Sequence, residues 1–175
     1  KALSANRSLP WTKELIEEYN TQWDWGELSE NTHLPWTAEL IEKYQDRWNW
    51  KLLSYYNRGL PWTAELLEKY QDRWDWYYLS QNDYLPWTEE LIEQFQDRLW
   101  WGKYCLSSSL HVAWTAELLE KYQKRWDWSD LSWNSSLVWT VELIEQYQYR
   151  WDMFGLKNNK NAVVQQWFKQ RNIKS

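Results

Sequence analysis

The sequence predicts an all-α protein in which six tandem copies of a two-helix repeat, each about 25 residues long, stack as a short solenoid. The tryptophan of a recurrent Leu-Pro-Trp-Thr phrase returns at spacings of 25, 26, 25, 27 and 25 residues, at Trp11, Trp36, Trp62, Trp87, Trp114 and Trp139. A Leu-Ser pair recurs in each copy, with a seventh, altered form at Leu156-Lys157. Tryptophan supplies 19 of 175 residues, so aromatic rings provide much of the area that each copy can bury.

The first helix of each copy begins after the threonine of the recurrent phrase. In the second copy Thr37 precedes an apolar-periodic run and is a natural N-cap. Trp36 and Ile41 take the positions of a hydrophobic staple. We expect one helical face to carry Leu40, Ile41, Tyr44 and Trp48, with Glu39 and Glu42 near the positive end of the helix dipole and Arg47 near the negative end.

A shorter second helix follows, with the pattern Trp-x-x-Leu-Ser. Its N-cap is an aspartate in most copies and Asn49 in the second copy. Trp25 and Leu28 lie three residues apart and therefore share one side of this turn. A recurrent asparagine is predicted to end the helix in a left-handed conformation, at Asn6, Asn31, Asn57, Asn82, Asn134 and Asn159.

No single copy can bury its aromatic face alone, so neighbouring copies must cover one another. A closed ring or a compact bundle of the same helix pairs is the main alternative to the solenoid. The array is expected to span residues 1–159, and because it starts in the middle of a unit we interpret it as part of a longer array.

Residues 160–175 are predicted to form an amphipathic, basic capping helix and tail. Val163, Val164, Trp167 and Phe168 share its apolar face. Its basic residues are a candidate contact with a partner or a membrane surface, and a solvated face on a structural cap is the competing interpretation; these residues are Lys169, Arg171 and Lys174.

The periodic tryptophans are interpreted as core, so function is sought at positions that vary between copies. Aromatic residues at such positions predict a tyrosine-rich recognition surface along one edge of the array, comprising Tyr55, Tyr56, Tyr77, Tyr78, Tyr84, Tyr104 and Trp133. Packing between neighbouring loops is the alternative explanation of these rings. The fourth copy is also irregular between Leu99 and Cys105, where either a bend or a site is expected.

Catalytic, metal and cofactor sites are not predicted. Glu14 and Glu17 have the types needed for acid/base chemistry, but the pair recurs in every copy and its place in a first helical turn explains it. Cys105 has His111 as its only local candidate base. No His/Cys cluster has metal-ligand spacing, no phosphate-binding loop is present, and no apolar run reaches the length of a membrane span.

The phrases LSQNDYLPWTEELIEQFQDR and LSENTHLPWTAELIEKYQDRWNW resemble tryptophan-rich repeats of proteins from Bacteroidetes and large DNA viruses. The resemblance extends to about Asn159, and it implies a repeat fold without any particular activity. The fourth copy departs from the pattern between Leu99 and Cys105, and the tail lies outside it.

The sequence therefore favours a non-catalytic array that binds a protein or peptide. A structural spacer in a larger assembly, and binding of single-stranded nucleic acid or carbohydrate by aromatic platforms, are the alternatives. Five basic residues and no acid follow Met153, so the preceding residues carry a net charge of −10 within a total of −5. That acidity disfavours nucleic acid.

Overall fold

The computed structural model describes residues 3–171, apart from the side chain of Tyr56. Over this range the secondary structure comprises twelve α-helices and one short 3-10 helix, without any named strand, so the fold is all-α with repeated tryptophan-rich helix pairs. The chain divides into two compact units, residues 1–85 and residues 86–175.

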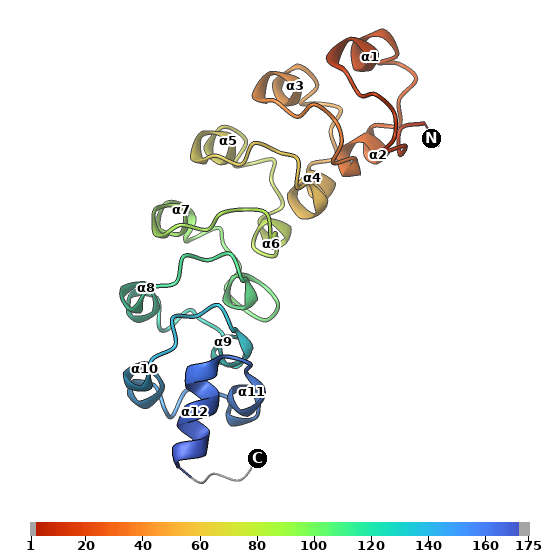
Figure 1. Cartoon of the computed structure of the whole chain (residues 1–175). Coiled ribbons are helices and arrows are strands. Elements are labelled where there is room, and N and C mark those ends of the chain that lie inside the picture. The colour runs from red at the N-terminus through yellow and green to blue at the C-terminus, as the bar shows by residue number, and fades with distance from the viewer. Residues whose placement is uncertain (1–2, 172–175) are drawn as a thin grey trace. The chain divides into compact units, whose positions relative to one another are not determined.

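The first unit contains three helix pairs. Helices α1, α3 and α5 are the first members of the pairs and lie side by side, and the second members α2, α4 and α6 form a neighbouring row (Figure 1). The pairs are α1 (Lys13–Glu18) with α2 (Trp25–Glu30), α3 (Ala38–Lys43) with α4 (Trp50–Tyr56), and α5 (Ala64–Lys69) with α6 (Trp76–Leu79).

The second unit continues the pattern and ends in a longer helix. Its first helices are α7 (Glu89–Phe95), α8 (Ala116–Lys121) and α10 (Val141–Gln146). Their partners are the 3-10 helix η1 (Leu106–Ser108), α9 (Trp128–Trp133) and α11 (Met153–Asn158), and α12 (Ala162–Gln170) follows. Helix α9 contacts both η1 and α11, so the second members again form a row within this unit.

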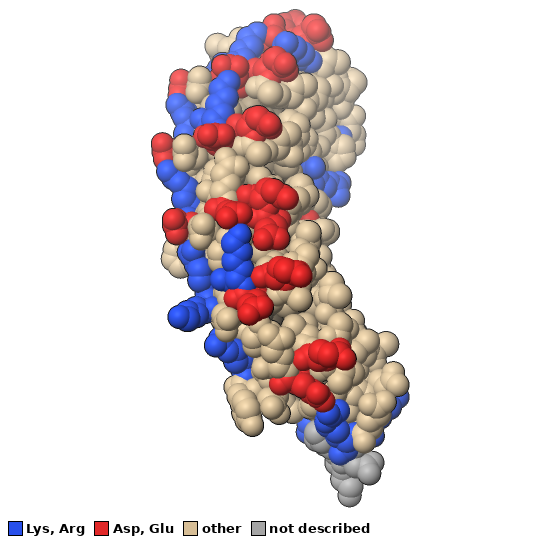
Figure 2. Space-filling model, turned by 90° about the vertical axis from the view of Figure 1, so that its left-hand side faces the viewer, with Lys and Arg blue, Asp and Glu red and all other residues tan. Residues whose placement is uncertain are grey.

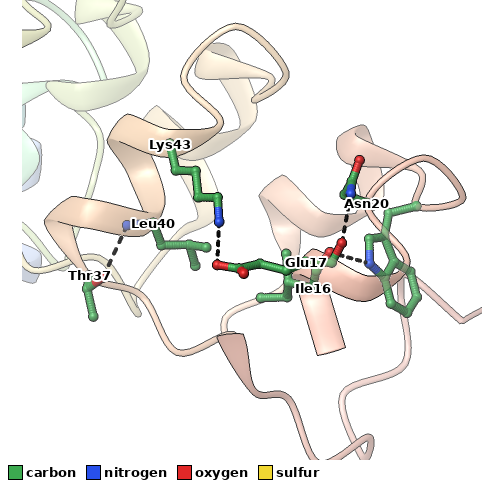
Figure 3. Close-up of polar contacts among 7 residues, drawn as sticks. Ile16, Glu17, Asn20, Thr37, Leu40 and Lys43 are labelled. Atoms are coloured by element: carbon green, nitrogen blue, oxygen red, sulfur yellow. Dashed lines mark hydrogen bonds and ion pairs between the residues drawn. The ribbon is translucent and has the colours of Figure 1, made fainter. Parts of the chain in front are cut away.

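The predicted N-caps of the first helices are confirmed, but these helices are shorter than expected. The Thr37 hydroxyl accepts a hydrogen bond from the Leu40 N–H at 3.2 Å (Figure 3). Helix α3 ends at Lys43, and the chain then turns through Tyr44, so the expected helix does not extend to Arg47 and Trp48. Trp48 still reaches the buried face, because its N–H bonds to the Tyr44 carbonyl at 3.3 Å.

The recurrent asparagines end the second helices in a way that corrects the sequence prediction. Asn57 has φ −85° and ψ 98°, which is extended backbone and not the left-handed conformation expected. The side chain is buried, and its Nδ2 donates to the Ser29 carbonyl of the preceding copy at 3.3 Å. Its Oδ1 accepts the Gly59 N–H at 2.8 Å. Asparagine is therefore used as a cross-copy bridge.

A recurrent serine completes this bridge, and we call the combined set of bonds the Ser-Asn ladder. The Ser29 hydroxyl donates to the Trp25 carbonyl at 2.6 Å and accepts the Asn49 N–H of the next copy at 2.9 Å. Corresponding bonds in the two units join the ladder serines Ser4, Ser54, Ser107 and Ser132 to the ladder asparagines Asn31, Asn82, Asn134 and Asn159 and to the cap residues of the following copies.

Aromatic rings fill the space between consecutive copies. The Trp25 ring lies 4.7 Å from the Tyr44 ring and 4.7 Å from the Trp48 ring of the next copy, and the Arg47 guanidinium lies 4.5 Å above it. Its indole N–H is also satisfied, since it donates to the Asn20 carbonyl at 3.1 Å. These contacts confirm that the periodic tryptophans build the core.

Charged side chains join the first helices of neighbouring copies. Lys43 of α3 pairs with Glu17 of α1 (Figure 3), and Lys69 of α5 pairs with Glu42 at 2.9 Å. In Figure 2 acidic and basic residues accordingly alternate over the side that carries the first helices. Because these pairs are exposed, solvent screening leaves each of them weak.

Candidate binding surface

The second helices present an edge that varies between copies. Within α2, the core takes Trp25, Leu28 and Ser29, while Gly26 and Glu27 are partly exposed and Glu30 is exposed. This division follows from helical geometry, because residues three and four apart share a face. The variable edge consists of the corresponding partly exposed positions in each copy together with the loop after the ladder asparagine.

A tyrosine cluster lies on this edge in the first unit, between α4 and α6. The rings of Tyr55 and Tyr78 have centroids 4.9 Å apart, and those of Tyr77 and Tyr78 are 5.3 Å apart. The Lys51 ammonium lies 4.9 Å from the Tyr78 ring centroid. Tyr77 is exposed and Tyr55 and Tyr78 are partly exposed, so the cluster combines lateral ring packing with accessible surface. Tyr56 belongs to the same helix, but its side chain lies outside the described residues.

A polar hollow of about 410 Å³ lies on the loop side of the same unit. It is lined by Arg7, Glu30, Thr32, Arg58 and Tyr84, which come from consecutive copies of the repeat. Four of them lie one or two residues after a recurrent asparagine, whose Oδ1 accepts the N–H two residues later and fixes the loop. The hollow is therefore lined by two guanidiniums, a hydroxyl, a phenol and one carboxylate.

The second unit carries aromatic residues at matching positions. Trp133 of α9 is 46% exposed, and its ring lies 5.7 Å from that of Phe154, which is 68% exposed. A Cβ added to Gly155 would lie 2.7 Å from the Trp133 Nε1, so glycine is required for the indole to lie against α11. Phe154 was not among the predicted surface residues. It directly follows Met153, which takes the place of the second-helix tryptophan, and this position could have indicated it.

The irregular fourth copy forms a loop that is pinned by Asp130. Trp100 stands where other copies have the capping aspartate or asparagine, and η1 has no side-chain cap. The loop folds back so that the Tyr104 N–H donates to the Asp130 carboxylate at 2.5 Å. Burial raises the pKa of the Asp130 carboxyl, and the Tyr104 N–H opposes that rise.

Tyr104 itself is strained and accessible. Its φ of 62° lies in the left-handed region that non-glycine residues rarely adopt, and its side chain is 66% exposed. The Lys103 ammonium lies 4.8 Å from its ring centroid. The fourth copy thus presents an exposed tyrosine through a loop in place of a helix.

The basic residues of the tail divide into different environments. Arg171 pairs with Glu145, and its guanidinium lies 4.5 Å above the Trp167 ring. Lys169 is exposed, and Lys174 lies outside the described residues. Val164, Trp167 and Phe168 of α12 are buried, and α12 contacts α10 and α11. Arg171 is therefore used to hold α12 against the last copy.

The residues considered for chemistry are not brought together. Cys105 is buried, His111 is exposed, and Glu17 is paired with Lys43, whose hydrogen bond lowers the pKa of the Glu17 carboxyl. Between residues 3 and 171, no group of three or more His, Cys, Asp or Glu side chains is placed to hold a metal ion. Over the same range, the helices are all too short or too polar to cross a membrane.

Comparison with protein-family models, with curated proteins and with solved structures finds no match to this chain.

Proposed function

We propose that this chain is a non-catalytic helical solenoid that binds a protein or peptide partner through its variable edge. The observation that supports this function is that constant and variable positions of the repeat have different roles. Constant residues form the contacts between copies, as in the Ser-Asn ladder, whereas the variable positions are exposed or partly exposed and enriched in aromatic residues. The tyrosine-rich surface predicted from the sequence, with Tyr84, Tyr104 and Trp133 beside the tyrosine cluster, is the proposed recognition surface.

The chemistry of the edge suits a peptide with both apolar and acidic groups. Tyrosine rings offer large contact areas with a polar tip and are favoured at binding hot spots. In the polar hollow of the same unit, Arg7 and Arg58 supply donors for a carboxylate or for peptide carbonyls. A partner segment that lays an aromatic or aliphatic side chain on the tyrosine cluster and an acidic group toward the polar hollow would use both.

Two alternatives use the same surface. Aromatic platforms also stack on bases and sugars, but the net charge of −5 gives little attraction for a phosphate backbone. A spacer function would leave the variable edge without a ligand. Retention on single-stranded oligonucleotide at low salt would favour the first alternative, and the absence of any selected ligand would favour the second.

The binding test begins with peptides selected from a displayed random library against the wild-type chain. A triple variant, Tyr55→Ser/Tyr77→Ser/Tyr78→Ser, is expected to weaken the selected peptides at least about tenfold, since truncated hot-spot residues change the binding free energy by about 2 kcal/mol or more. Tyr149→Ser is the matched control, because Tyr149 is 94% exposed and lies in the turn after α10, outside the proposed surface. Equal binding by the triple variant and the control would refute the proposal.

The solenoid has its own test in solution scattering. A compact globule of 175 residues has a radius of gyration of about 16 Å. An extended stack of six copies is expected to exceed that value clearly. A radius near the globular value would refute the solenoid and favour the compact bundle.

A further inference from the structure

Two arginines of the first unit differ from those that hold the copies together. The arginines in the turns after the first helices contact the preceding copy, as Arg47 does at 4.5 Å above the Trp25 ring. Arg7 and Arg58 are exposed instead, and within residues 3–171 neither guanidinium has a hydrogen bond, an ion pair or a cation–π contact. Their donors are therefore available to a ligand.

Both of these guanidiniums line the polar hollow of about 410 Å³. Arg7 and Arg58 have the same position in the repeat, directly after the recurrent asparagines Asn6 and Asn57. The Oδ1 of each asparagine accepts the N–H two residues later, at 2.8 Å in both copies. The backbone that carries each arginine is thus fixed, and two copies direct a guanidinium to one hollow.

Gly59 allows the loop that carries Arg58 to approach the loop of the second copy. A Cβ added to Gly59 would lie 2.6 Å from the Trp36 Cδ1 and 2.8 Å from the Thr32 carbonyl oxygen. Both distances are too short for a real side chain, so a larger residue would displace this loop. The close approach places Arg58 beside Thr32, which also lines the hollow.

We propose that the polar hollow binds a phosphorylated side chain of the peptide partner, an inference that rests on the proposed function and names the group recognised. A phosphate monoester carries a charge of about −1.5 to −2 at pH 7 and has three strong acceptor oxygens. A carboxylate has two oxygens, which one guanidinium engages in a bidentate pair. Two guanidiniums at one hollow therefore suit the phosphoryl group better, and arginine clusters are a recurring means of recognising it.

The other lining residues supply a donor, a ring and one opposing charge. The phenol of Tyr84 can donate to a phosphoryl oxygen, and its side chain is 52% exposed, which leaves a face for an aromatic side chain of the ligand. Phosphotyrosine is accordingly the probe. The carboxylate of Glu30 is the one acidic group among the lining residues, and it opposes an anion there.

The distribution of charge favours one phosphoryl group on a peptide over a nucleic acid. Binding to a nucleic acid depends on cations that neutralise successive phosphates. The position after the recurrent asparagine carries a cation in the first and third copies only, since the second copy has Thr32 and the fourth has Asp83 there. The positive charge is therefore confined to one place on a chain whose net charge is −5.

The test uses the full chain and a peptide with one tyrosine flanked by glycines, in phosphorylated and unphosphorylated forms. In an NMR titration the phosphorylated peptide should shift the side-chain Nε–H resonances of Arg7 and Arg58, and the unphosphorylated peptide should not. Arg7→Gln and Arg58→Gln should each weaken binding about tenfold, as expected for the loss of a hydrogen bond to a charged group.

Lys160→Gln is the matched control for these two variants. Lys160 is exposed and also directly follows a recurrent asparagine, but it does not line the hollow. Its substitution changes the net charge equally and should leave the affinity for the phosphorylated peptide unchanged. Glu30→Gln removes the opposing carboxylate and should tighten binding about two- to fivefold, the range of an exposed charge pair. This increase does not depend on damaging the fold.

The phosphoryl group and the tyrosine cluster are tested separately. The triple tyrosine-cluster variant should lose the library-selected peptides and keep the Arg7 and Arg58 shifts with the phosphorylated peptide. Selected peptides that bind the cluster while the phosphorylated peptide causes no shift would overturn the phosphoryl site alone. Equal shifts with the unphosphorylated peptide, equal affinities of Arg58→Gln and Lys160→Gln, or tighter binding of a single-stranded oligonucleotide would also overturn it.

Discussion

The ladder asparagine is predicted to contribute far more to stability than its immediate neighbour in the sequence. Asn159 is 1% exposed, and its Nδ2 donates to the Ser132 and Asn134 carbonyls at 2.9 and 3.3 Å. Its Oδ1 accepts the Asn161 N–H at 2.9 Å. Asn159→Ala removes all three bonds and leaves their partners without an obvious replacement.

Three net hydrogen bonds of about 1 kcal/mol each predict a loss of about 2–4 kcal/mol in the free energy of unfolding. Asn158→Ala is the matched control, because Asn158 is exposed and makes one bond, to the Phe154 carbonyl at 2.8 Å. A change within about 0.5 kcal/mol is expected there.

Urea unfolding followed by circular dichroism measures both variants. With an m-value of about 2–3 kcal/mol/M, Asn159→Ala should lower the midpoint by about 1 M, and Asn158→Ala should leave it nearly unchanged. Hydrogen exchange in α12 reports whether the loss is confined to the last copy. If the two alanine variants unfold at the same midpoint, the ladder does not have the energetic role argued from its geometry.

Two further predictions concern caps and charge. Thr63→Ala should destabilise the chain by about 1 kcal/mol in thermal unfolding, since the Thr63 hydroxyl accepts the Leu66 N–H. Thr21→Ala, at an exposed position, is the control. Equal effects of the two substitutions would contradict the capping role. Burial raises the pKa of the Asp130 carboxyl above its value in the unfolded chain, so the charged carboxylate opposes folding as pH rises. The stability of Asp130→Asn relative to wild type should therefore grow between pH 3 and pH 7. A stability difference that stays constant with pH would contradict this prediction.

Local sequence signals predicted the caps and the buried rings because both depend on residues that are near in the chain. Thr37 lies three residues before the N–H that it caps, and Trp25 and Leu28 are one helical turn apart. The role of the asparagines could not be predicted this way. Asn57 bonds to a serine 28 residues earlier, and a left-handed terminator was the best explanation that local propensity offered.

The candidate surface was predicted only in part, because local sequence signals again identified some of its residues and not others. Variation between copies identified Tyr77, Tyr84 and Tyr104 as edge residues, and the structure exposes each of them. The polar hollow was missed because Arg7 and Arg58 are 51 residues apart, and no local pattern connects them. The signal that could have found it is their shared position, directly after a recurrent asparagine.

The irregular fourth copy indicates which contacts define a joint between copies. Its second helix is replaced by a loop and η1, yet Trp101 lies 4.9 Å from Tyr122 and 4.6 Å from Trp126, as Trp25 does in a regular joint. Ser107 also accepts the Asp127 N–H at 2.9 Å. The tryptophan and the serine are therefore retained where the helix is not. Because the joint depends on these two side chains, the remaining positions of the second helix are available to change, and the variable edge is the consequence.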